Sequence, residues 1–351
     1  MEQLTNPALR LPERHKREGV RYAVTDDGVE LPIVDVTHSA FAVSLGEAEQ
    51  RARVTAFMQE QDPLAKLPRF VRRPLVRFFL RGSVLGRAIG AAGSSFLSGM
   101  NTYLLKLGPE NLGDAYAKPV DRKIAAALPT FAMRLRLSDM ARLIADAARR
   151  ALDASPPERP LHLLSIAGGP AVDCLNALIL LQGEAPHVLA GRHVEIVVLD
   201  LDTAGPHFGA RALAALGAPG AALAGLDVRF ERVHYDWSNP TALVPVLEEA
   251  RARGAMTIAS SEGGLFEYGS DEEILANLAT LRAGSGPALV VVGSVTRADE
   301  PMQRLRATSR IPTRPRGLPV FRNLAERAGF RLDRVIERPF SDHVTLVPTG
   351  V

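Results

Sequence analysis

Short apolar runs alternate with helical segments over residues 160–348, and this alternation constrains the fold more than any other feature of the chain. The expected strands lie at 161–166, 194–199, 228–233, 256–259 and 288–292, and all but 228–233 are mainly apolar. Segments with helical character follow at 170–182, 206–216, 241–253, 271–282 and 319–328. Strands of a parallel sheet are covered by helices on both faces, so they are apolar along their whole length. The pattern predicts an α/β fold with a doubly wound, mostly parallel sheet.

The end of the chain departs from this alternation. Residues 330–337 and 342–347 have strand character, and only 338–341 join them. A link this short cannot cross over the sheet, so the two strands must pair antiparallel. The expected sheet therefore has seven strands and a terminal antiparallel hairpin.

A proline-rich segment, 156–160, divides the chain into two parts of different character. Before it, apolar residues recur at helical spacing, most clearly over 131–154, and 45–61 and 70–92 also have helical character. Residues 20–37 hold a Val- and Ile-bearing stretch that the pattern leaves unassigned. We expect a mainly helical N-terminal substrate or lid region over 1–155 and an α/β domain over 156–351.

The formal net charge of +3 conceals an asymmetry. Segment 63–109 has no Asp or Glu and carries eight positive residues, so the rest of the chain has a net charge of 3 − 8 = −5. The eight are Lys66, Arg69, Arg72, Arg73, Arg77, Arg81, Arg87 and Lys106. Three interpretations stay open: a solvated helical face, a lid that attracts an anionic acceptor, and a basic amphipathic helix on a membrane. The acidic remainder argues against a nucleic-acid partner.

Two further features bear on where the protein works. The N-terminus is charged and lacks the apolar core of a secretory signal, and no apolar run approaches the ~18 residues of a membrane-spanning helix. The single cysteine, Cys174, excludes a disulfide framework and a cysteine-based zinc site. We expect a cytoplasmic protein, either a monomer or a homodimer.

Short motifs follow the ends of the expected strands, where ligands bind in doubly wound sheets. Ser165-Ile166-Ala167-Gly168-Gly169-Pro170-Ala171 spans the end of the first strand, and Asp200, Leu201 and Asp202 follow the second. His234-Tyr235-Asp236-Trp237 follows the third strand, and Ser260-Ser261-Glu262-Gly263-Gly264-Leu265-Phe266-Glu267-Tyr268 follows the fourth. The first motif lacks the third glycine of a dinucleotide-binding turn, so a dehydrogenase is disfavoured.

In layout and in these motifs, residues 160–348 resemble the class I S-adenosylmethionine-dependent methyltransferases, whose seven-stranded sheet has its last strand antiparallel. In the glycine motif Ser165 replaces the family's acidic residue, and Ala167 and Ala171 replace glycines. The fourth motif is similar to a segment of the carboxyl methyltransferases related to the leucine carboxyl methyltransferase. The resemblance implies S-adenosyl-L-methionine as the cofactor and a small molecule as the acceptor, and we expect a role in secondary metabolism.

The resemblance also implies roles for individual residues. Asp200 is expected to accept from the ribose hydroxyls, with Asp202 as a competing candidate, and Asp236 to accept from the adenine amino group. The full set of expected cofactor contacts is Ser165, Ala167, Gly168, Gly169, Asp200, Leu201, Asp236, Trp237 and Ser261. An ordinary turn, two capping carboxylates and a core tryptophan are the structural alternatives.

Methyl transfer requires alignment of the acceptor and exclusion of water, and an oxygen or nitrogen acceptor that carries a proton also needs a base. The catalytic candidates are Glu262, Tyr268 and His207. Met100, Tyr103 and Phe266 are candidates for the substrate pocket, with plain packing as the alternative. His343 is interpreted as structural, and no residues have metal-ligand spacing, so no metal is expected.

Two other functions stay open at this point. One is a fold relative that binds S-adenosylmethionine without transferring its methyl group. The other is a membrane-associated interaction protein that uses segment 63–109.

Overall fold

The computed structural model describes residues 11–44, 46–60, 83–86, 98–113, 118–285, 288–308 and 312–350. The expected helix at 70–92 lies outside the described residues, apart from 83–86. All positive residues of segment 63–109 except Lys106 lie outside them too. The interpretations of that segment as a surface therefore stay predictions.

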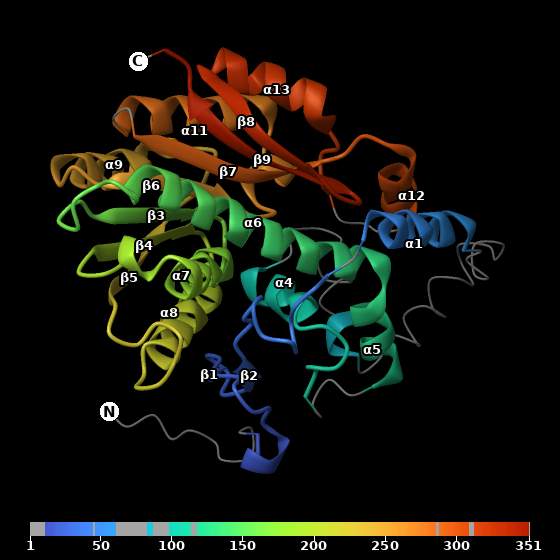
Figure 1. The fold of residues 1–351 in the computed structure, drawn as a ribbon. Helices are drawn as coiled ribbons and strands as arrows, with labels where there is room; N and C mark the ends of the chain where they lie inside the picture. Colours follow the sequence, from blue (N-terminus) through green and yellow to red (C-terminus); the bar gives the residue numbers. More distant parts are fainter. Residues whose placement is uncertain are drawn as a thin grey trace.

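A seven-stranded sheet forms the centre of the molecule (Figure 1). Its strands are β3 (Leu161–Ile166), β4 (His193–Asp200), β5 (Asp227–His234), β6 (Met256–Ser261), β7 (Leu289–Thr296), β8 (Phe330–Glu337) and β9 (Ser341–Pro348). They lie in the order β5-β4-β3-β6-β7-β9-β8. Neighbours from β5 to β7 pair parallel, whereas β9 pairs antiparallel with both β7 and β8. The predicted mostly parallel sheet with a terminal antiparallel hairpin is confirmed.

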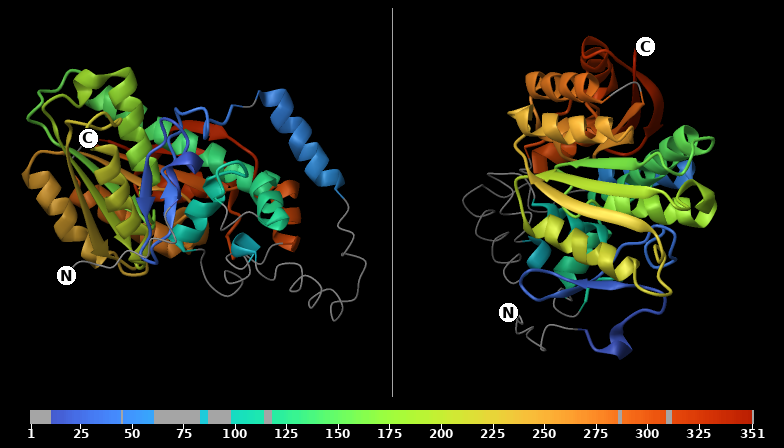
Figure 2. Two further views of the ribbon diagram at one scale, coloured as in Figure 1. Left: turned by 90° about the horizontal axis from the view of Figure 1, so that it is seen from below. Right: turned by 90° about the vertical axis from the view of Figure 1, so that its left-hand side faces the viewer.

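Helices cover both faces of the sheet (Figures 1 and 2). One face carries α6 (Leu128–Leu152), α7 (Val172–Glu184) and α8 (Ala204–Leu216), and the other carries α9 (Leu243–Ala252), α11 (Asp271–Gly284) and α13 (Gly317–Arg327). Successive strand residues point to opposite faces. Leu163 accordingly belongs to the core under α7, and Leu164 to the core under α11. This two-sided burial is why the strands are apolar runs.

The remaining described elements are shorter. They are η2 (Glu13–His15), β1 (Tyr22–Val24), β2 (Glu30–Pro32), α1 (Glu47–Gln59), α4 (Gly99–Lys106), α5 (Pro119–Ala126), η5 (Pro186–Val188), η6 (Pro240–Ala242), α10 (Leu265–Tyr268) and α12 (Glu300–Thr308). The hairpin of β1 and β2 fills the stretch that the sequence left unassigned, and β1 packs against α8. Among the described helices, none is long and apolar enough to cross a membrane.

Helix α6 joins the N-terminal half to the sheet. It packs along α7 and also contacts β6, β7 and β9. It is therefore one of the helices that cover the sheet, although it precedes the proline-rich segment in the chain. The division of the chain at 155 stays a prediction.

Candidate functional site

The turn after β3 keeps the backbone path of a glycine motif although two alanines replace glycines. Ala167, Gly169 and Ala171 have φ of +53°, +56° and +50°. A left-handed conformation costs a residue with a side chain about 1–2 kcal/mol, and such strain persists where the surrounding structure holds the backbone in place. The alanines therefore adopt the conformation that glycine would adopt at these positions.

Two helices pack closely against this turn. Helix α4 begins at Gly99, whose Cα hydrogen faces the turn so closely that a Cβ there would lie 2.6 Å from the Gly169 Cα. From α8, a Cβ on Gly205 would lie 2.8 Å from the same atom. Ser98 caps α4, since its hydroxyl accepts from the Asn101 N–H at 3.2 Å. Glycine at both contacts lets the N-terminal half lie directly on the β3 turn.

Asp200 ends β4 and faces the same turn. Its carboxylate accepts from the Gly169 N–H at 3.0 Å and from the Asp202 N–H at 2.9 Å. Burial raises the pKa of Asp200, and the two backbone N–H groups oppose that shift. Each oxygen has one backbone donor and further lone pairs, so the carboxylate can accept hydroxyl groups from a ligand.

A cavity, here called the edge cavity, opens at the carboxyl ends of β3, β4 and β6. The Ala167–Gly168 turn, Asp200 and Trp237 line one part of it, and α4 closes it from the N-terminal half. Its lining is Ser98, Gly99, Thr102, Lys106, Ala167, Gly168, Asp200, Leu201, Asp202, Tyr235, Trp237, Glu262, Gly263, Gly264 and Tyr268. The predicted residues Ala167, Gly168, Asp200, Leu201, Trp237, Glu262 and Tyr268 are thus brought together.

A second cavity, here called the α6 cavity, adjoins the first. Thr102, Gly263 and Tyr268 line both. The rest of its wall comes mainly from apolar residues of α6, of α12 and of the link before β9, namely Pro129, Ala132, Met133, Met302, Leu305, Pro339 and Phe340. The shared residues mark the place where two ligands could meet.

Other predicted cofactor contacts lie near the edge cavity without lining it. Ser165 is buried beneath Gly168, Ser261 is buried at the end of β6, and Gly169 contributes its N–H to Asp200. Asp236 is exposed and accepts from the Ser238 N–H at 2.9 Å, within a local turn. Asn239, rather than Asp236, caps the short helix η6. Its neighbour Trp237 is the residue that faces the cavity.

The predicted substrate residues belong to the core. The Tyr103 hydroxyl donates to the Pro32 carbonyl at 2.7 Å and accepts from the Val34 N–H at 3.0 Å. Phe266 is buried with its ring centroid 4.8 Å from that of Phe321. Met100 packs against the core under α7. None of the three lines either cavity, and their contacts favour the packing alternative, so their role as substrate contacts stays a prediction.

The structure also places His207 away from the cavities. Its Nδ1 lies 2.9 Å from an Asp26 carboxylate oxygen, and its side chain is half exposed. Asp26 lies in the turn between β1 and β2, a contact that the sequence did not predict. His207 lines neither cavity, and its catalytic role stays a prediction.

A buried charge cluster lies between the two cavities and was not predicted. Lys106 and Arg136 both donate to the Glu262 carboxylate, Arg136 Nε at 3.0 Å. Arg136 also pairs with Glu267 at 2.8 Å, and Ser294 donates to Glu267 at 3.2 Å. Two cations face two carboxylates, so the cluster is neutral overall.

The cluster changes the expected chemistry of Glu262. Burial acts to raise its pKa, but Lys106 and Arg136 outweigh burial and lower it. A carboxylate held ionised by two cations is a weak proton acceptor. The geometry therefore favours a positioning role for Glu262. Arg136 lies among the apolar positions of the predicted helix at 131–154, and a charged residue in such a place was the sequence signal for this buried cluster.

Tyr268 occupies the junction of the cavities. Burial raises the pKa of its hydroxyl, with the Glu267 carboxylate adding to the shift. The hydroxyl therefore stays protonated at neutral pH and can donate a hydrogen bond to a bound ligand.

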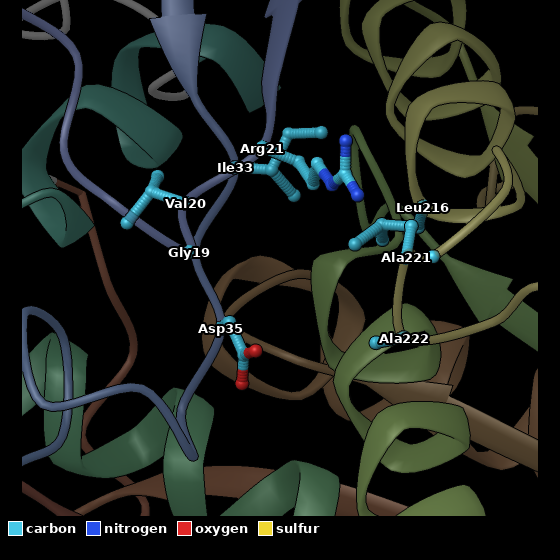
Figure 3. Close-up of a pocket in the computed structure, with 9 residues that line it drawn as sticks. Gly19, Val20, Arg21, Ile33, Asp35, Leu216, Ala221 and Ala222 are labelled. Carbon is cyan, nitrogen blue, oxygen red and sulfur yellow. The ribbon is translucent and has the colours of Figure 1, made fainter.

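A third cavity lies elsewhere, between the β1–β2 region and the end of α8 (Figure 3). Figure 3 shows the Arg21 side chain pointing toward Leu216, while Asp35 points away from both. Helix α8 runs back from the carboxyl edge of the sheet, so its last residue lies toward the opposite edge. This cavity contains none of the predicted site residues. Within the described part of the chain, no group of three or more His, Cys, Asp or Glu residues could hold a metal ion.

No family model and no curated protein matches the chain. Among solved structures it is similar to a possible exported protein from Bordetella parapertussis, at 19% identity and a TM-score of 0.56, over 88% of this chain and 100% of that one. It is also similar to the mitomycin 7-O-methyltransferase MmcR, at 13% identity and a TM-score of 0.40, over 82% and 76% of the two chains. The pyocyanin biosynthetic protein PhzM has 17% identity and a TM-score of 0.40, over 87% and 74%.

The strand order and the antiparallel β9 define the fold as that of the class I methyltransferases. The similarity to the Bordetella protein supports the same arrangement over most of the chain. At 19% identity this similarity concerns the fold alone.

Proposed function

We propose that this protein is an S-adenosylmethionine-dependent methyltransferase that methylates an oxygen or nitrogen atom of a small molecule. The observation that carries the proposal is the junction of the two cavities at Thr102, Gly263 and Tyr268. In doubly wound folds ligands bind at the carboxyl ends of the strands, where the edge cavity lies. A second, mostly apolar cavity beside it suits an acceptor.

The residues of the edge cavity fit the cofactor. Asp200 supplies a half-buried carboxylate with free lone pairs, which suits a vicinal diol such as that of ribose. Trp237 offers a flat apolar face to a purine. The Ala167–Gly168 turn allows close approach of a ligand backbone because its side chains are small. When bound, S-adenosylmethionine supplies a methyl group activated by its sulfonium.

The protein's own residues then have positioning tasks. Helix α4 covers the edge cavity and helps to exclude water, and the α6 cavity holds the acceptor against apolar side chains. Tyr268 can donate to a polar group of the acceptor at the junction. The charge cluster leaves no room for a side chain at Gly263, since a Cβ there would lie 2.5 Å from the Arg136 guanidinium. A biosynthetic role and a cytoplasmic location belong to this proposal as well.

Calorimetric titration with S-adenosylmethionine and S-adenosylhomocysteine tests the cofactor site. Asp200→Ala removes a charged acceptor of two hydroxyls, each worth about 1.5–3 kcal/mol, so affinity should fall at least about tenfold. Asp236→Ala is the matched control, because its carboxylate is exposed and outside the cavity lining. Equal affinity of Asp200→Ala and the wild type would refute the site.

Transfer is tested separately from binding. The wild type and Asp200→Ala are incubated with S-adenosylmethionine carrying a labelled methyl group and a small-molecule cell extract. Labelled small molecules that form with the wild type but not with Asp200→Ala would support methyl transfer by this protein. Tight binding with no labelled product would instead favour a fold relative that binds the cofactor without transferring methyl.

A further inference from the structure

A serine, a histidine and an aspartate form a hydrogen-bonded chain at the wall of the α6 cavity. The Ser341 Oγ lies 3.0 Å from His343 Nε2, and His343 Nδ1 lies 2.9 Å from Asp139 Oδ2. The three residues are 6%, 0% and 9% exposed. These are the contacts that a nucleophile, its base and the group that orients the base make in serine hydrolases.

The fold brings these residues together from distant parts of the chain. Ser341 and His343 lie two positions apart on β9 and point to one face, which α6 covers. Asp139 lies on α6, one turn after Arg136. A carboxylate can only accept, so Nδ1 carries a proton, and in the neutral imidazole Nε2 then offers its lone pair to the Ser341 hydroxyl.

A further contact holds Asp139 in place. The Arg338 guanidinium donates to both of its oxygens, at 2.7 and 3.0 Å. Burial acts to raise the pKa of Asp139, and the hydrogen bonds from His343 and Arg338 outweigh burial and lower it. The carboxylate is therefore ionised and fixed in the orientation that directs the imidazole.

Two features beside Ser341 point to a ligand. Thr296 faces Ser341 across the β7–β9 ladder, and its hydroxyl is buried with no hydrogen-bond partner among the described residues. Both residues line the α6 cavity. Phe340, directly before Ser341, has φ of +69°, a strained conformation for a residue with a side chain. A buried polar group left without a partner is costly, which a bound ligand would remedy.

We propose that Ser341, His343 and Asp139 form a second catalytic site, which hydrolyses small esters that enter the α6 cavity. The Ser341 oxygen attacks the ester carbonyl carbon, and its proton passes to His343 Nε2. The carbon–oxygen bond to the alcohol breaks, and the alcohol leaves with that proton. Water then attacks the acyl-serine with His343 as the base, which releases the acid and restores the serine.

Thr296 has a role in the same site. Its hydroxyl can donate to the carbonyl oxygen as negative charge develops there, as side-chain donors do in other oxyanion sites. This activity does not depend on the proposed methyl transfer, because it uses neither the edge cavity nor its cofactor. The alternative is a purely structural chain that ties β9 to α6.

Phenylmethanesulfonyl fluoride is the probe for the nucleophile, since it is small and carries an aromatic ring that suits an apolar cavity. The wild-type chain is incubated with the probe, and intact mass and peptide mapping locate the adduct. We expect one adduct, on Ser341, and a rate at least about 100-fold lower in His343→Gln, which cannot act as a base. Ser285→Ala is the control, because Ser285 is also buried with a hydroxyl that has no partner among the described residues.

Hydrolysis of 4-nitrophenyl acetate tests the complete reaction. Wild-type turnover that Ser341→Ala abolishes and Ser285→Ala retains would support the site. Thermal melting confirms that each chain is folded. A folded wild type with no adduct on Ser341 would overturn the nucleophile and leave the structural chain. An adduct without turnover of the acetate would overturn the hydrolytic step.

Discussion

The charge cluster between the cavities offers a quantitative test of how the site is built. Glu262→Gln keeps the shape of the side chain and removes its charge. Lys106, whose side chain is only 4% exposed, then loses the carboxylate that it pairs with. Breaking a buried ion pair in this way costs about 3–5 kcal/mol. Arg136 keeps its ion pair with Glu267 at 2.8 Å, so we expect a loss at the lower end of this range, about 3 kcal/mol.

Urea unfolding followed by far-ultraviolet circular dichroism at neutral pH measures this loss. The comparison requires that the free energy of unfolding falls with urea concentration at the same slope in the variant and in the wild type. Glu184→Gln is the matched control. Glu184 accepts two hydrogen bonds from Arg142, at 2.5 and 2.7 Å, but both side chains are more than a third exposed. Exposed pairs contribute at most about 1 kcal/mol, so this variant should be nearly as stable as the wild type.

The double variant Lys106→Met, Glu262→Gln checks the physical cause. If the penalty comes from a stranded buried cation, removing the cation should restore part of the lost free energy of unfolding. The pKa of Glu262 is lowered in the folded protein, so its contribution is complete above about pH 4.3 and is lost as the pH falls further. Equal losses from Glu262→Gln and Glu184→Gln would refute the reasoning.

Three further outcomes follow from the geometry. Gly99→Ala should lower the free energy of unfolding in urea by about 1–3 kcal/mol, because its Cβ would lie 2.6 Å from backbone. Gly46→Ala, at the N-cap of α1 with nothing within 4 Å of its Cβ, should cost less than about 1 kcal/mol. For Ala167→Gly the free energy of unfolding should lie within about 1 kcal/mol of the wild-type value, because relief of the strained positive φ offsets the greater freedom of the unfolded chain. A larger loss of stability would show that the Ala167 backbone is not strained. Asp139 has a lowered pKa, so it stabilises the fold above about pH 4 and loses this effect as the pH falls. In an acid titration of stability, Asp139→Asn should therefore flatten the curve, and an unchanged curve would contradict the pairing.

The sheet was predictable because its signal is local. Strands β3, β4, β6 and β7 are buried on both faces, so nearly every residue in them is apolar or small, and the runs stand out against their neighbours. The capping box at Ser270 is a local signal of the same kind, because it lies within four consecutive residues: the Ser270 hydroxyl accepts from the Glu273 N–H at 3.1 Å. Elements such as β1, β2 and α12 are short or polar, and their pattern does not separate them from loops.

The site was predictable only where it follows a strand end. Asp200 and the Ala167–Gly168 turn lie at fixed places relative to β4 and β3, so topology brings them to one edge. Asp236 also follows a strand, but its carboxylate forms a local turn with Ser238 and points outward. A local hydrogen bond of this kind competes with any ligand contact and leaves no trace in the spacing.

The contacts that join the two halves could not be found from the sequence, because their partners are far apart along it. Lys106 and Glu262 are separated by 156 residues, and Arg136 and Glu262 by 126. Lys106 also changes the interpretation of the basic segment 63–109. This charge is buried and neutralised in the cluster, so it contributes nothing to a basic surface and cannot attract an anionic acceptor from a distance. It stabilises the contact of α4 with the sheet, and any attraction of anions must come from the other positive residues of that segment.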